Sequence, residues 1–152
     1  EFVPGNHVVY KSFYLTDRPF GRWSGSCSSD RMAVMSPEQF AIEIARLADD
    51  NKCEDVVIMD LRGRSSVTDL FVICSGTSDR QMRSTADAMI AHAKRLGQRP
   101  YGTSGYQNAT WILVDFVDVV IHIFTREHRA YYDLELLWGD APRLDWTRSA
   151  TA

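Results

Sequence analysis

The side chains most able to bind a metal or attack a substrate are four histidines and three cysteines. No pair of histidines has the i, i+4 spacing with a further acid that is typical of a helical zinc site, so no metal is predicted. His122 could serve as a general base, but spacing alone identifies no nucleophile or orienting carboxylate for it. A Ser-His-Asp arrangement, a P-loop and a dinucleotide motif are all missing from the sequence.

The segment Gly76–Asp79 could bind phosphate, because free backbone N–H groups at a helix start attract anions. Nucleotidyltransferases use a related Gly-Ser opening, followed by metal-binding carboxylates two residues apart. The nearest carboxylates here, Asp79 and Asp87, form no such pair, and Asp115 and Asp118 are separated by a predicted bend. We interpret the segment as a strand-to-helix connection, with a nucleotide-binding enzyme as the alternative hypothesis.

The cysteines Cys27, Cys53 and Cys74 show no metal-ligand spacing, and Cys74 lies in an apolar strand pattern that favours a small buried side chain. We therefore expect a reducing compartment and no disulfide framework. Arginines near predicted loop ends form either a small basic patch or an ordinary solvated surface: Arg62, Arg64, Arg80 and Arg83.

The segment Trp111–Thr125 predicts two strands folded on each other, with a bend near 116–118. If the connection has an even number of residues, alternation gives one wholly apolar face made of Ile112, Val114, Phe116, Val119, Ile121 and Ile123. The other face carries Trp111, Leu113, Asp115, Val120, His122 and Phe124. Its mixture of aromatic rings, a carboxylate and an imidazole indicates either a binding surface or a face covered by a helix.

Other periodic segments surround this pair of strands. Ser36 and Gln39 predict a capping box for a helix ending near Asn51, and the same spacing recurs at Ser78 and Gln81 before a helix ending near Gly97. Strands are expected over 56–61 and 70–75, as an antiparallel pair, with a short strand near residue 101. A last helix over 126–138 is expected to turn four side chains inward: Tyr131, Leu134, Leu137 and Trp138. This order predicts an α/β fold, a mixed β-sheet flanked by helices.

The composition is that of one ordinary globular domain, with 45% hydrophobic and 24% charged residues among 152. A net charge of −3 argues against a general nucleic-acid binder, so no direct sequence-specific nucleic-acid contact is expected. No apolar run approaches the roughly 18–20 residues of a membrane span, and no membrane partner is predicted. We interpret residues 1–35 as an irregular or disordered N-terminal extension, 36–146 as the domain, and 147–152 as a C-terminal tail.

Five segments, taken in order, resemble the ribosomal silencing factor family, also called the Iojap family. Each segment alone is weakly specific, but the five share one register across residues 36–146. They are Asp60–Asp69, Phe71–Asp79, Trp111–Asp115, Asp118–Phe124 and Tyr132–Pro142.

The resemblance implies a non-enzymatic translational repressor without a cofactor. Such a protein binds the large ribosomal subunit at ribosomal protein fourteen and blocks joining of the small subunit. It also implies a nucleotidyltransferase-like topology without catalytic residues, and we expect a bacterial cytoplasmic protein, or alternatively an organellar one. A homodimer in the absence of the ribosome is a further hypothesis.

The family's contact surface corresponds to the pair of strands. The residues that the resemblance assigns to it are Trp111, Leu113, Asp115, Phe116, Asp118, His122 and Phe124. Acidic groups at Asp115, Asp118 and near Glu127 would face cations of a basic ribosomal protein. The family usually has glycine where this chain has Val117. Because a β-branched residue resists positive φ, we expect the bend to differ or lengthen.

Overall fold

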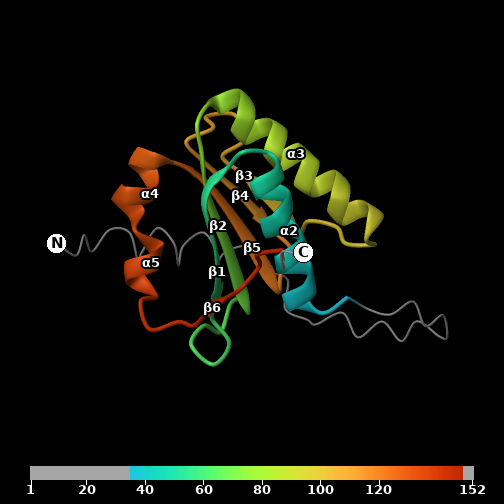
Figure 1. Ribbon diagram of the computed structural model, residues 1–152, viewed down its shortest axis with the longest axis vertical. Coiled ribbons are helices and arrows are strands. Elements are labelled where there is room, and N and C mark those ends of the chain that lie inside the picture. The colour runs from blue at the N-terminus through green and yellow to red at the C-terminus, as the bar shows by residue number, and fades with distance from the viewer. Residues whose placement is uncertain (1–34, 149–152) are drawn as a thin grey trace. The chain divides into compact units, whose positions relative to one another are not determined.

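A six-stranded mixed β-sheet forms the centre of the computed structural model, which describes residues 35–148 (Figure 1). The strand order is β3-β4-β5-β2-β1-β6. The strands are β1 (Glu54–Asp60), β2 (Leu70–Gly76), β3 (Gly102–Ser104), β4 (Trp111–Asp115), β5 (Val119–Thr125) and β6 (Arg143–Leu144). β2 and β5 pair in parallel, whereas the other neighbouring pairs are antiparallel. The predicted extension lies outside the described residues, apart from Met35, and so do residues 149–152 of the predicted tail.

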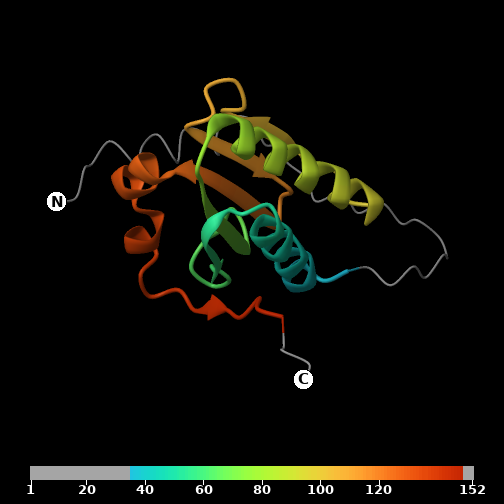
Figure 2. The same cartoon turned by 45° about the horizontal axis from the view of Figure 1, so that its top comes forward.

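Helices flank the sheet on both sides (Figures 1 and 2). The helices α2 (Pro37–Asp50) and α3 (Asp79–Arg95) pack on one face, and the short helices α4 (Arg126–Tyr132) and α5 (Leu134–Leu137) lie on the other. Phe40 and Ile44 of α2 join Met82 and Met89 of α3 in the hydrophobic core beneath them. The predicted mixed α/β fold is thus confirmed. Among the described residues, no helix is both long and apolar enough to span a bilayer.

Hydrogen bonds at the helix starts explain where α2 and α3 begin. Ser36 and Gln39 form the predicted capping box of α2. At α3, Ser78 Oγ accepts from the Gln81 backbone N–H at 3.2 Å, but the Gln81 side chain accepts from Thr77 N–H at 2.6 Å instead of completing a box. The Gln81 amide also donates to the Lys52 carbonyl at 2.8 Å, which ties α3 to the end of α2.

The last helix is broken, contrary to the prediction of one helix over 126–138. Asp133 adopts a left-handed conformation (φ 43°, ψ 58°), ends α4, and caps α5 by accepting from the Leu136 N–H at 3.3 Å. The break rotates the helical faces, so Tyr131 is 61% exposed and its predicted inward position is wrong. Leu134 is buried as predicted.

The hairpin of β4 and β5 has the predicted register. Trp111 pairs with Phe124 and Asp115 with Val120, which confirms the two faces inferred from alternation. At the bend, Val117 itself adopts φ 74°, and the Asp118 N–H donates to the Phe116 carbonyl at 3.0 Å, as in a γ-turn.

The segment after α5 forms an edge strand that the sequence did not predict. β6 pairs with β1. Beyond it, the Trp146 indole N–H donates to the Val56 carbonyl at 2.9 Å, and the Trp146 carbonyl accepts from Arg46 at 3.0 Å. Arg148 forms an ion pair with Asp50, at 2.7 Å. These contacts fix the described end of the chain against β1 and α2.

Candidate functional site

Stacked aromatic rings lie on the sheet face that carries α4 and α5. Trp111 of β4 stacks on Phe124 of β5, with ring centroids 5.0 Å apart and planes 25° apart. Tyr132 of α4 lies against the same indole, 4.5 Å between centroids. His122 lies beside both, 5.8 Å from Trp111 and 6.0 Å from Phe124. We call Trp111, His122, Phe124 and Tyr132 the aromatic cluster. Trp111 and Tyr132 are its partly exposed members.

His122 is a structural member of this cluster. Its ring is fully buried, with Phe71 edge-on at 4.5 Å. Burial lowers the pKa of His122 to about 3, so the imidazole is neutral near pH 7. The Trp111 indole N–H donates to His122 Nδ1 at 3.1 Å, which requires that this nitrogen carry no proton. A base with so low a pKa binds a proton poorly at neutral pH, so the geometry gives no support to His122 as a general base.

Arg129 holds α4 against the sheet next to the cluster. Its side chain is 11% exposed, and one guanidinium nitrogen donates to Ser75 Oγ of β2 at 2.9 Å. The other terminal nitrogen forms an ion pair with Glu135 of α5, at 2.5 Å. Both short helices are thereby connected to each other and to the centre of the sheet. This connection positions Tyr132 on Trp111.

The predicted surface residues do not all gather in one place. Leu113 lies on the same face as Trp111 but is buried. Asp115 is also buried there, and its carboxylate accepts from the Val117 backbone N–H at 2.7 Å, so it shapes the bend. Phe116 lies on the opposite face and packs edge-on against Phe40, at 4.9 Å. Asp118 is exposed at the tip of the hairpin.

Three side chains on α4 and α5 were missing from the predicted site. Tyr132 contacts Trp111 directly, and two apolar side chains nearby are exposed: Tyr131 by 61% and Leu136 by 74%. Large apolar side chains with such exposure are candidates for a protein contact. The sequence signal that could have revealed them is Asp133, because aspartate is one of the residues that tolerates a left-handed conformation and interrupts a helix.

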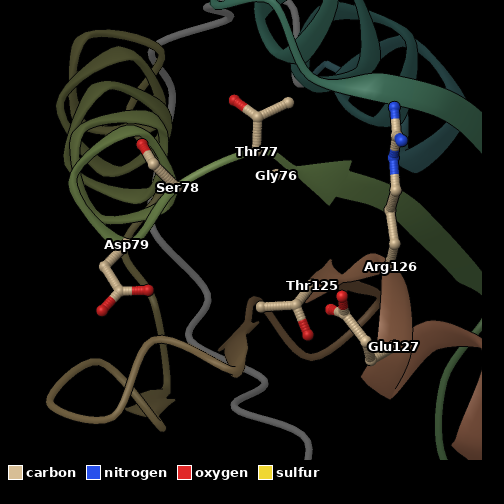
Figure 3. A pocket seen from close by; sticks show the side chains of 7 residues that line it. All are labelled: Gly76, Thr77, Ser78, Asp79, Thr125, Arg126 and Glu127. Carbon is tan, nitrogen blue, oxygen red and sulfur yellow. The ribbon is translucent and has the colours of Figure 1, made fainter.

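The Gly76–Asp79 segment lines a pocket of about 250 Å³, together with Thr125, Arg126 and Glu127 (Figure 3). The segments come from two strand-to-helix junctions, β2–α3 and β5–α4. Gly76 has a packing role, since a Cβ there would lie 2.2 Å from Met82 Cγ. Asp79 and Glu127 oppose a bound phosphate electrostatically, and no group of three or more metal-ligating side chains occurs in the described part of the chain. This geometry favours the strand-to-helix connection over a nucleotide site.

The four arginines considered for a basic patch lie at opposite ends of β2. Arg62 and Arg64 are in the loop before this strand, and Arg80 and Arg83 are on the helix after it. The seven residues of β2 separate the two pairs by about 20 Å. Arg62 also forms an ion pair with Asp60, at 2.6 Å. The alternative of ordinary surface residues is therefore the correct one.

Comparison with known proteins gives consistent similarities. A family model described as "Ribosomal silencing factor during starvation" matches residues 34–152. A ribosomal silencing factor of Halalkalibacterium halodurans is 39% identical over 111 residues, covering 73% of this chain and 95% of that protein. A ribosomal silencing factor of Bacillus subtilis is 43% identical over 101 residues, covering 66% of this chain and 86% of that protein. The chloroplastic Iojap protein of Arabidopsis thaliana is 31% identical over 109 residues, covering 70% of this chain and 44% of that protein.

Two solved structures resemble the fold. A crystal structure of a protein from Chromobacterium violaceum matches with a TM-score of 0.67 and 27% identity, covering 77% of this chain and 97% of that one. A crystal structure of a protein from Bacillus halodurans matches with a TM-score of 0.60 and 37% identity, covering 71% of this chain and 95% of that one.

Proposed function

Because the chain belongs to the ribosomal silencing factor family, we propose that it is a translational repressor that binds the large ribosomal subunit and blocks subunit joining. The family supports a ribosome-associated role in regulating translation. The observation that supports this proposal is the match of the family model over residues 34–152. Steric exclusion requires only a stable protein–protein contact. It requires no catalysis, and the neutral, buried His122 is consistent with a protein that acts by binding.

We assign the contact to the side of the molecule where Trp111 and Tyr132 are partly exposed. Tyr131 and Leu136 add exposed apolar surface nearby on α4 and α5. Protein interfaces are dominated by a few aromatic anchors surrounded by less important contacts, and this arrangement fits that pattern. The buried members of the cluster, His122 and Phe124, would support the anchor without touching the partner. The proposed partner within the large subunit is ribosomal protein fourteen.

Two exposed acids, one on α4 beside this surface and one at the distant hairpin tip, would assist the encounter with a basic ribosomal protein. Asp118 and Glu127 are exposed, at opposite ends of β5. The buried Asp115 carboxylate is bonded to the bend and offers little charge to a partner. Rim charges of this kind raise association rates more than they raise affinity.

The test is co-sedimentation of the Trp111→Ala variant with purified large ribosomal subunits. If Trp111 is an anchor, its loss weakens binding by about 2 kcal/mol, roughly 30-fold in the dissociation constant. Tyr101→Ala is the matched control, because Tyr101 is also a partly exposed aromatic residue but precedes β3 at the sheet edge. Wild-type co-sedimentation by a folded Trp111→Ala variant would reject this contact surface.

The compartment we propose is the bacterial cytoplasm, in line with the bacterial relatives. An organelle is the alternative, because relatives named as chloroplastic and mitochondrial Iojap proteins also match.

A further inference from the structure

Two thiols lie next to each other beneath the helices α2 and α3. Cys53 precedes β1, Cys74 lies in β2, and these strands pair in antiparallel fashion with Glu54 opposite Ser75. Both cysteines belong to the same hydrophobic core, and the strand pairing makes them diagonal neighbours across β1 and β2. The Cys53 sulfur is also 3.6 Å from the Thr85 hydroxyl oxygen.

The two thiols have different environments. Cys53 is 6% exposed, whereas Cys74 has no exposed surface. The interaction with the Cys74 thiol lowers the pKa of Cys53 to about 7, and the hydrogen bond between Cys53 and Thr85 lowers it further, against the opposing effect of burial. The same non-covalent interaction between the two thiols, together with burial, raises the pKa of Cys74. Cys53 is therefore the better nucleophile, and Cys74 is placed to react with it in a second step.

The backbone around Cys53 is irregular in a way that leaves room for adjustment. Lys52 and Asp55 both have positive φ, 66° and 49°. The ladder between β1 and β2 shifts register between Glu54 and Val57. A β-bulge leaves one residue unpaired and disrupts the ladder locally, and the Cys53 N–H donates to the Ala48 carbonyl of α2 instead of to β2, so a small movement of Cys53 toward β2 breaks few strand hydrogen bonds.

We propose that Cys53 and Cys74 are an oxidative modification site that forms a reversible disulfide when the protein meets a hydroperoxide. The Cys53 thiolate attacks the peroxide oxygen, forms a sulfenic acid and releases hydroxide or alkoxide. The Cys74 sulfur then attacks the Cys53 sulfur, and its proton leaves with the hydroxyl group as water. Overall, two thiols lose two electrons and two protons, and the peroxide is reduced. This site is independent of the ribosome-binding proposal.

The test uses the full chain with Cys27→Ser, which removes the third cysteine. The protein is treated with hydrogen peroxide, denatured and alkylated, and its intact mass and its peptides are measured. We expect both thiols to be protected from alkylation, a mass lower by two hydrogen atoms, and a peptide linking Cys53 to Cys74. Dithiothreitol restores both thiols. Full alkylation after peroxide treatment, or added oxygen atoms without the linked peptide, overturns the proposal.

Single variants test the order of the two steps. In Cys74→Ala, the Cys53 sulfenic acid persists and is trapped by dimedone. In the matched Cys53→Ala variant, dimedone labels the buried Cys74 at least tenfold more slowly than it labels Cys53 in Cys74→Ala. Faster labelling of Cys74 would overturn the assignment of Cys53 as the attacking thiol. Because the wild-type cysteine pair is measured without either substitution, a variant that fails to fold does not remove the main test.

Discussion

His122 shows how one buried side chain links the aromatic cluster to pH. The indole of Trp111 donates to its Nδ1, so the cluster needs the neutral imidazole. The ordinary histidine pKa is 6.5, and burial lowers that of His122 to about 3. Below pH 6.5 the unfolded chain binds a proton that the folded chain does not bind until about pH 3. The stability that His122 supplies is therefore fully present above pH 6.5 and is lost progressively as the pH falls from 6.5 to about 3.

We predict that the free energy of unfolding falls from pH 6.5 to 5 more steeply in the wild type than in His122→Asn. The Asn oxygen can accept from the Trp111 indole but does not titrate. The difference in slope is at most about 1.4 kcal/mol per pH unit. Urea denaturation at several pH values measures it. The comparison is kept above pH 5 because most carboxylates titrate lower. Equal slopes would contradict the assignment of a low pKa to His122.

Val117 stores strain at the tip of the hairpin. Its φ of 74° is unfavourable for a β-branched residue, and its side chain is 45% exposed, so packing compensates little. We predict that Val117→Gly raises the free energy of unfolding by about 1 kcal/mol, after the entropy that glycine adds to the unfolded chain. Urea denaturation gives the value. Val117→Ala, which keeps a Cβ, should gain less. A loss of stability in Val117→Gly would show that the bend is not strained.

At the scale of elements, short sequence patterns predicted the features that neighbouring residues determine, such as a helix start or the two faces of a hairpin. Ser36 and Gln39 identified the start of α2, and alternation along β4 and β5 identified both faces of the hairpin. The break at Asp133 was missed because the apolar spacing on either side fits one continuous helix. β6 was missed because its two residues form a strand only by pairing with β1. No period can be read from so short a segment.

Arg129 connects α4 to α5 and to the sheet through an ion pair and a hydrogen bond. Its ion pair with Glu135 is largely buried, and its bond to Ser75 reaches β2. We predict that Arg129→Met lowers the free energy of unfolding by about 2–3 kcal/mol, because Glu135 keeps its charge without its partner. Thermal or urea denaturation measures the loss. Arg126→Met is the matched control, since the Arg126–Glu54 pair is exposed and its removal should change stability little. Similar effects of both substitutions would contradict a special role for Arg129.

At the scale of the molecule, the two faces of the sheet have different coverage. The longer helices α2 and α3 cover one face, and the short, broken pair α4–α5 lies on the other. Side-chain alternation predicted which hairpin residues share a face. Alternation also placed Phe116 on the apolar face opposite Trp111, where it packs against Phe40 of α2. The assignment of Phe116 to the contact surface came from the family resemblance, and its burial under α2 gives that assignment no support. Alternation could not supply the exposed Tyr131 and Leu136, because their positions depend on how α4 and α5 dock.

The exposed apolar surface on α4 and α5 leads to a prediction about assembly. Without a large subunit to cover them, Leu136 and Tyr131 remain in contact with water, and pairing with a second copy would bury both. We therefore predict a weak homodimer, whose mass in light scattering rises above 17.3 kDa as concentration increases. Leu136→Asp should keep the protein monomeric, because a charge in a dimer interface loses its hydration. Val117→Asp, which adds the same charge at an exposed apolar side chain of the distant hairpin tip, should leave the mass unchanged.

Large subunits should compete with this dimer if both use the same surface. Adding subunits would then convert dimer into bound monomer, and Leu136→Asp would weaken both associations together. A protein that is monomeric at every concentration contradicts the dimer but not ribosome binding. A Leu136→Asp variant that loses the dimer yet binds subunits normally would place the two contacts on different surfaces. The ribosome contact would then have to be centred on Trp111 without reaching α5.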